Sequence, residues 1–134
     1  MPSAVLDSFA LIAYLRDEPG GQKVEQLLLA ALANGHSLYM TEVNYAECKY
    51  MTLRKQGKQP WAKAANLIES LPIEFTPADR GLSNLAADFK ANNKISLADA
   101  YAAALAKSKN LELVTGDPEF KQLEGQIGII WLPQ

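Results

Sequence analysis

Short apolar runs alternate along the chain with longer segments in which apolar residues recur every three or four positions. The short runs predict β-strands at residues 4–6, 37–40, 72–75, 111–114 and 127–131. The longer segments predict helices over residues 9–15, 24–32, 42–54, 61–70, 77–91 and 97–107. Short strands that alternate with helices are typical of an α/β domain whose mainly parallel sheet is covered on both faces.

Polar residues mark where several of these helices should begin. Thr41 and Ser96 stand directly before apolar-periodic segments, as N-cap residues do. Thr76 is followed by Pro77 and then by Asp79, which predicts a cap, a proline at the first helical position and an acid in the first turn. Gly35, after Asn34, predicts the end of the second helix.

The composition limits the chemistry that the chain can support. Its 134 residues are 49% hydrophobic and 21% charged, which fits a single domain over residues 1–134. One histidine and one cysteine leave no multi-histidine metal centre, no cysteine-rich zinc site and no disulfide. No run approaches the length of a membrane span, so we expect a cytoplasmic protein with no membrane partner. Any catalysis should rest on carboxylates.

Two acids directly follow predicted strands. Asp7 comes after the run at residues 4–6, and Asp117 follows residues 111–114 across Thr115 and Gly116. In open parallel sheets, binding sites form outside the carboxyl ends of the strands. Both acids could instead be helix caps. The two roles are compatible, because a capping aspartate is expected to keep one carboxylate oxygen free.

Two further acids lie on predicted helices. Glu47 interrupts a mostly apolar stripe, with Asn44 three residues before it as a possible neutral ligand or orienting residue. The alternative is a Glu at the margin of the stripe that reaches solvent. Asp99 is the one acid in an otherwise small and apolar segment, although its spacing from Ser96 also fits a capping box.

Four carboxylates near strand ends and buried helix turns suggest an oxygen-only site for a hard divalent cation. Mg2+ prefers such ligands, and Mn2+ accepts the same set. The reaction that such a site supports best is phosphodiester hydrolysis, in which metal ions activate water without a histidine.

A basic segment could supply the positive surface that a polyanionic substrate needs. Between residues 49 and 63 there are five bases and no acid, namely Lys49, Arg54, Lys55, Lys58 and Lys63. Tyr50 and Trp61 are interleaved with them, so the segment could follow a phosphate backbone and stack a base. Cations that complement a helix dipole are the alternative interpretation.

Four blocks of sequence resemble the PIN-domain ribonucleases, and most closely the VapC-type toxins of toxin-antitoxin pairs. They are Val5-Leu6-Asp7-Ser8-Phe9-Ala10-Leu11-Ile12-Ala13, the stretch from Thr41 through Ala46-Glu47, Ser96-Leu97-Ala98-Asp99-Ala100-Tyr101-Ala102-Ala103-Ala104, and Leu113-Val114-Thr115-Gly116-Asp117-Pro118-Glu119-Phe120. Together they span essentially the whole chain. The acidic quartet of the family falls on Asp7, Glu47, Asp99 and Asp117, the same positions that strand ends and helix faces indicate.

The resemblance implies a three-layer α/β/α sandwich with about five mainly parallel strands. It further implies Mg2+- or Mn2+-dependent RNA cleavage, a homodimer, and inhibition by a small cognate antitoxin. Asp7, Asp99 and Asp117 would hold the principal metal, and Glu47 would be a further ligand or orient the attacking water. Ser8, Asn44 and Thr115 would support them by hydrogen bonds, and Lys49, Arg54, Lys55 and Lys58 would contact RNA. The family usually has a hydroxyl or amide residue where this chain has Phe9.

Two rival functions follow from the same residues. An aspartyl-nucleophile phosphatase would need a second Asp two residues after Asp7, and Phe9 occupies that position. A non-catalytic metal-binding or protein-interaction module of the same fold is the other alternative. Cys48 is expected to be a buried apolar residue rather than a nucleophile, because no paired histidine is in evidence.

Overall fold

A computed structural model describes residues 3–133 and contains one five-stranded sheet. The strands are β1 (Ala4–Leu6), β2 (Leu38–Thr41), β3 (Ile73–Thr76), β4 (Glu112–Thr115) and β5 (Ile129–Trp131). They lie in the order β3-β2-β1-β4-β5, and every neighbouring pair is parallel. The predicted α/β class with a parallel sheet of about five strands is confirmed.

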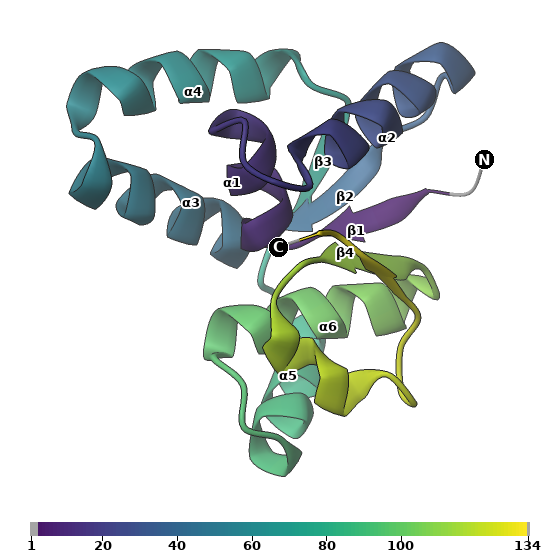
Figure 1. The fold of residues 1–134 in the computed structure, drawn as a ribbon. Helices are drawn as coiled ribbons and strands as arrows, with labels where there is room; N and C mark the ends of the chain where they lie inside the picture. The colour runs from purple at the N-terminus through teal and green to yellow at the C-terminus, as the bar shows by residue number, and fades with distance from the viewer. Residues whose placement is uncertain (1–2, 134) are drawn as a thin grey trace.

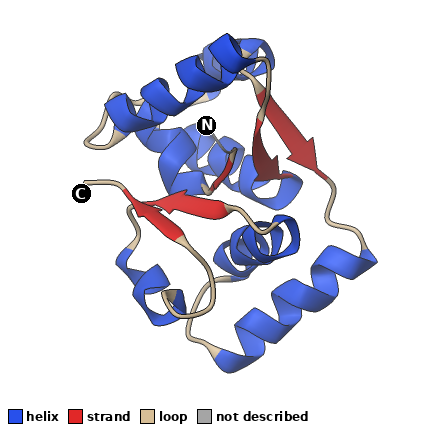
Figure 2. Cartoon of the chain, turned by 90° about the vertical axis from the view of Figure 1, so that its right-hand side faces the viewer, coloured by secondary structure: helices blue, strands red, loops and turns tan. Residues whose placement is uncertain are grey.

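The helices follow the strands in the expected alternation. They are α1 (Ser8–Leu15), α2 (Gly21–Asn34), α3 (Glu42–Lys55), α4 (Lys58–Ser70), α5 (Arg80–Asn92) and α6 (Leu97–Lys109), with a 3-10 helix η1 at Pro118–Leu123. Helices α1 to α4 lie on one side of the sheet, and α5 and α6 lie on the other (Figure 1). The view from the side likewise has helices on both sides of the strands (Figure 2).

Several element boundaries differ from the sequence prediction by one to three residues, and two of these differences have a clear local cause. The predicted Thr76 cap is wrong, because Thr76 is the last residue of β3 and pairs with Thr41. Asp79 caps α5 instead, and its Oδ1 accepts a hydrogen bond from the Leu82 backbone N–H at 2.9 Å. Helix α4 begins at Lys58, three residues earlier than expected, after Gly57 turns the chain with a φ of 99°.

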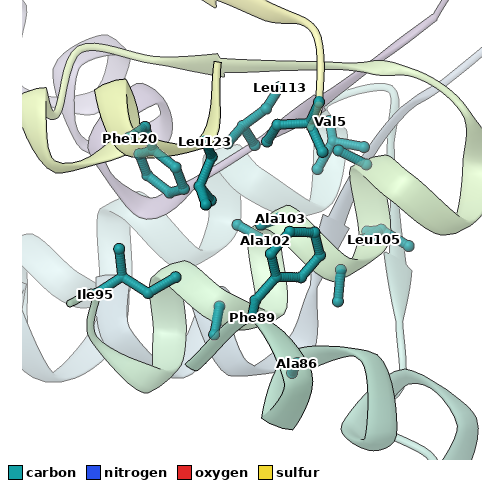
Figure 3. Close-up of a cluster of buried hydrophobic side chains, with 14 of the residues drawn as sticks. Val5, Ala86, Phe89, Ile95, Ala102, Ala103, Leu105, Leu113, Phe120 and Leu123 are labelled. Carbon is teal, nitrogen blue, oxygen red and sulfur yellow. The ribbon is translucent and has the colours of Figure 1, made fainter. Parts of the chain in front are cut away.

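Alternate residues of each central strand face opposite cores. Val5 and Leu113 pack with the alanine-rich face of α6 and with Phe89 of α5 (Figure 3). Their neighbours Leu6 and Val114 point to the other side, where they pack against residues of α1 and α2. The small alanines of α6 allow this helix to lie close to the sheet, so its first turn is held firmly beside the strand ends.

The parallel arrangement brings three chain segments to one edge of the sheet. Strands β1, β2 and β4 are neighbours, and each runs directly into a helix or turn at its carboxyl end. Asp7, Glu42 and Gly116 are the first residues beyond these strands. Among the described residues, no helix is long and apolar enough to cross a membrane.

Candidate functional site

The four predicted acids line one pocket of about 340 Å³. Asp7 lies between β1 and α1, and Asp117 lies between β4 and η1. Glu47 comes from α3, and Asp99 comes from the first turn of α6. Residues far apart in the chain therefore meet at the carboxyl edge of the sheet, where parallel α/β folds place their sites.

Asp7 is the most deeply buried of these acids, with 1% of its surface exposed. It caps α1, because its Oδ1 accepts a hydrogen bond from the Ala10 backbone N–H at 2.8 Å. The expectation that its second oxygen is free is wrong, since Oδ2 accepts a hydrogen bond from the Thr115 hydroxyl. Burial, together with the smaller effect of the negative charges of Asp99 and Asp117, raises the pKa of Asp7 to about 8 despite these two bonds.

Thr115 connects two of the acids. Its hydroxyl donates to Asp7, and the same oxygen accepts a hydrogen bond from the Asp117 backbone N–H at 3.0 Å. Asp117 in turn caps η1, with Oδ1 accepting from the Glu119 N–H at 2.9 Å. Thr115 is fully buried, so its one hydroxyl fixes the relative positions of the ends of β1 and β4.

Asp99 is 9% exposed and lies in the first turn of α6. Its backbone N–H donates to the Ser96 hydroxyl at 3.1 Å, so Ser96 is the cap that the sequence predicts. Burial raises the pKa of Asp99 to about 7, and the negative charges of Asp117 and Glu47 contribute to the increase. Two neighbouring carboxyl groups with raised pKa values indicate a pocket in which buried acids repel one another.

Glu119 joins the site without having been predicted. Carboxylate oxygens of Asp99, Asp117 and Glu119 lie within 4.8 Å of one another, close enough to share a cation. Glu119 stands two residues after Asp117, and the 3-10 turn that Asp117 caps brings it back to the pocket. An acid at this spacing after a capping aspartate is the signal that could have revealed it.

The predicted supporting residues do not all contact the acids. Asn44 is fully buried, and its Nδ2 donates to Ser8 Oγ and to the Ala98 carbonyl, both at 3.2 Å. Its Oδ1 accepts from the Thr41 hydroxyl, so it joins α1, α3 and α6 rather than acting as a neutral ligand. Ser8 Oγ donates to the Asn44 carbonyl at 3.3 Å, and within residues 3–133 it has no hydrogen bond to a carboxylate.

Glu47 is half-buried and faces the pocket from α3. Its Oε2 accepts a hydrogen bond from the Tyr50 hydroxyl at 3.4 Å. Cys48, the next residue, is fully buried as predicted, and burial together with Asp7 and Glu47 raises the pKa of its thiol well above the usual range. A thiol with such a pKa is not a nucleophile near neutral pH.

Phe9 lines the pocket at the position where the family usually has a hydroxyl or amide residue. Its ring packs on the backbone of Gly116, where a Cβ would lie 2.4 Å from the Phe9 Cε1 atom. An aspartyl-nucleophile phosphatase would need an acid here, so the structure offers no support for that rival.

The basic segment is only partly directed at the acids. Lys55 lines the pocket, whereas Lys58 is exposed at the start of α4. Lys49 Nζ lies 6.0 Å from the centre of the Trp61 ring. The Arg54 guanidinium lies 5.0 Å from the centre of the Tyr50 ring. The expectation that Trp61 could stack a base is wrong, because it is 8% exposed and makes an edge-on contact with Tyr45 in the core.

The acids of the pocket fit a hard divalent cation. Carboxylate oxygens are the ligands that Mg2+ and Mn2+ share, and no thiol or imidazole lines the pocket among the described residues to favour a softer metal. The raised pKa values of Asp7 and Asp99 reflect burial and mutual repulsion that a bound cation would relieve.

Comparison with known proteins gives the family and the fold of this chain. The sequence profile of the PIN domain family matches residues 4–126. One similar structure is the crystal structure of VapBC2 from Rickettsia felis bound to a DNA fragment from the VapBC2 promoter. It superposes on this chain with a TM-score of 0.79 at 14% identity, and the match covers 98% of this chain and 100% of that chain.

Two further solved structures have the same fold. DNA-bound VapBC from Salmonella typhimurium has a TM-score of 0.74 at 17% identity, with 97% of this chain and 98% of that chain covered. VapC20 from Mycobacterium tuberculosis, described as a sarcin-ricin loop cleaving toxin, has a TM-score of 0.70 at 15% identity, with 93% and 96% covered. A search of curated protein sequences finds no match.

Proposed function

This chain belongs to the PIN-domain family, and from that membership and the acidic pocket we propose that it is a Mg2+- or Mn2+-dependent endoribonuclease, the toxin of a toxin-antitoxin pair. The observation that carries the proposal is the meeting of Asp7, Glu47, Asp99 and Asp117 in one pocket. Phosphodiester hydrolysis by such a site needs no histidine, and the chain has only one.

The acids divide into those that would hold the metal and one that would activate water. Asp7, Asp99 and Asp117 would hold the principal metal, which when bound lowers the pKa of water and stabilises the leaving oxygen. Glu119 lies close enough to Asp99 and Asp117 to take part in the same site. Glu47 approaches from a different element, α3, where it would orient the attacking water and accept its proton. Thr115 would keep Asp7 and Asp117 in register through its hydroxyl.

A protein partner is part of the proposal. The Rickettsia felis and Salmonella typhimurium structures are both of VapBC, and a further match is a toxin-antitoxin complex from Klebsiella pneumoniae. On α2 of this chain, Leu29 and Leu32 are exposed by 58% and 65%. Large exposed leucines on one helix favour a surface that a partner covers. We infer a small cognate antitoxin, and a homodimer of the toxin itself.

The alternative is a non-catalytic metal-binding or interaction module of the same fold. The raised pKa values of Asp7 and Asp99 mean that these buried acids destabilise the folded state at neutral pH. A module without catalytic activity would have no need to keep four acids and Thr115 together at this cost. The cost of holding these groups together favours a catalytic role.

Cleavage of RNA by the purified protein tests the proposal. Total RNA is incubated with the protein in Mg2+, Mn2+ or EDTA, and the cut ends are mapped. We expect discrete cuts with either metal and none in EDTA. Asp99→Asn should abolish cleavage, whereas Asp88→Asn, which alters an exposed acid of α5 outside the pocket, should leave it unchanged. Cleavage that survives in Asp99→Asn at the wild-type rate would refute the assignment.

A further inference from the structure

Arg16 is a cation of the acidic pocket that has no part in the chemistry proposed above. It is the C-cap residue of α1, and its side chain lines the pocket together with Asp7, Glu47 and Asp99. Its Nη2 atom is buried and has no hydrogen-bond partner, and across residues 3–133 its guanidinium makes no ion pair within 4.0 Å. A buried donor without a partner costs free energy, which an acceptor brought by a ligand would recover.

The same residue lines a second pocket. This pocket has a volume of about 260 Å³ and lies between α1, α3 and α4. Arg16 and Lys63 are its charged residues, and no acid among the described residues lines it. The amide of Gln56 and the apolar surfaces of Ala64 and Leu67 form another part of its wall. Arg16 therefore stands at the boundary between an acidic pocket and one that attracts negative charge.

We propose that the Arg16 guanidinium binds an RNA phosphate next to the cleaved one, so that the nucleotide beyond it lies in the second pocket. This inference rests on the proposed function for the identity of the strand. A guanidinium offers a fork of donors that matches phosphate geometry in two-point contact. Lys63 is then placed to meet the following phosphate, while Leu67 and Gln56 face the base and its edge.

Charge decides between RNA and a peptide as the occupant. A peptide from a protein partner would gain little from two cations with no acid beside them unless it were itself acidic. A nucleic acid strand carries one phosphate per nucleotide, so two neighbouring phosphates would supply one anion for Arg16 and one for Lys63. The two pockets share Arg16, so a strand that leaves the pocket in which cleavage is proposed can pass directly into the second one.

Binding of RNA tests the contact separately from cleavage. The probe is a fluorescein-labelled pool of random 12-nucleotide single-stranded RNA, measured by anisotropy in Mg2+ on the Asp99→Asn background. We expect Arg16→Gln to weaken binding roughly tenfold or more, the loss typical of a charge-assisted hydrogen bond. The slope of log Kd against log salt concentration should fall by about 0.7, as for one phosphate contact to a single strand.

Two companion variants separate this role from a structural one. Arg16→Lys keeps the charge and should retain the salt slope while recovering only part of the affinity. Arg80→Gln removes an exposed guanidinium from α5, far from Arg16 in sequence and lining neither pocket, and should bind as the background does. If Arg16→Gln weakened binding only by disturbing the fold, Arg16→Lys would not restore the dependence of Kd on salt concentration.

Single methylphosphonate substitutions then locate the phosphate. Once cleavage maps a cut site, each linkage on either side of it is made neutral in turn. One neighbouring linkage should slow cleavage by the wild-type protein and have no further effect on Arg16→Gln. The inference would be overturned if every neutral linkage slowed cleavage equally in the wild-type protein and in Arg16→Gln. It would also be overturned if Arg16→Gln bound RNA with unchanged affinity and salt slope. Either result would leave the second pocket to a protein partner. Failure of the wild-type protein to cleave RNA, with the binding results as expected, would instead overturn the proposed function.

Discussion

The cost of holding Asp7 in a buried pocket can be measured by replacing it with asparagine in the metal-free protein. The asparagine side chain would keep the cap to the Ala10 N–H through its carbonyl oxygen, and its amide would donate to Thr115 Oγ, where the Asp7 carboxylate accepts from it. The substitution therefore removes the titrating group and preserves the shape of the site.

The expected size of the effect follows from the pKa of Asp7, which rises from 3.8 to about 8 on folding. A raised carboxyl pKa means that the folded state binds a proton that the unfolded state has released. Its cost is absent below pH 4, grows as the pH rises, and is complete above pH 8. A tenfold difference in proton affinity corresponds to about 1.4 kcal/mol, so the cost at pH 7 is on the order of 4 kcal/mol.

Urea unfolding in EDTA at pH 5 and at pH 8 provides the assay. The free energy of unfolding of the wild-type protein should fall between these pH values by about 4 kcal/mol more than that of Asp7→Asn. Titrating groups that do not interact with Asp7 contribute equally to both proteins and cancel in this difference. Asp88→Asn, at an exposed position, should follow the wild type. If the wild-type and Asp7→Asn stabilities change in parallel with pH, the burial argument for Asp7 is wrong.

Three further predictions concern the surroundings of the acids. Thr115→Val removes the hydroxyl that donates to Asp7 and accepts from the Asp117 N–H. We expect the free energy of unfolding, measured in urea, to fall by roughly 1–3 kcal/mol and RNA cleavage to fall severely. Unchanged cleavage would contradict the positioning role of Thr115. Gly116→Ala would place a Cβ 2.4 Å from the Phe9 ring and displace it; cleavage should fall while the Phe9→Ala, Gly116→Ala double variant loses no more than Phe9→Ala alone. Cys48 should resist alkylation by iodoacetamide at pH 8 in the folded protein and react after unfolding, and rapid labelling of the native thiol would show that it is accessible.

The sequence predicts the fold well because its signals are local. Apolar runs too short for helices, such as residues 4–6, are bounded by polar residues that can cap the next helix, and the structure has a strand and a helix there. The Thr76 boundary fails because β2 extends the pairing of β3 to its last residue, which outweighs the local cap signal. Tertiary pairing of this kind is invisible in one segment.

The site is predicted where an acid follows a strand or interrupts an apolar face. Asp7 and Asp117 meet the first condition, and Glu47 and Asp99 meet the second. Arg16 and Glu119 were missed because each lies near other polar residues, Asp17-Glu18 and Lys121-Gln122, where a charge has no local significance. Arg16 reaches the pocket because α1 ends beside it, and Glu119 reaches it because η1 turns back toward it.

The hydrogen bonds of Asn44 and Asp7 depend on three-dimensional packing in the same way. Spacing places Asn44 on the same side of α3 as Glu47, but its partners Ser8 and Ala98 come from two other helices. Neither hydrogen bond can be predicted from the residues that surround Asn44 in the sequence. The sequence therefore indicates which residues gather, and the structure determines which of them bond to one another.

Titration of Mn2+ with parallel measurement of binding and RNA cleavage tests the central claim most directly. Isothermal titration calorimetry records Mn2+ binding to the wild-type protein and to Asp99→Asn, and the cleavage rate is measured at the same Mn2+ concentrations. The proposed site predicts that the wild-type cleavage rate rises along the binding isotherm and that Asp99→Asn loses both. Cleavage that saturates without measurable Mn2+ binding, or full Mn2+ binding by a protein that cuts no RNA, would contradict a metal-dependent nuclease in this pocket.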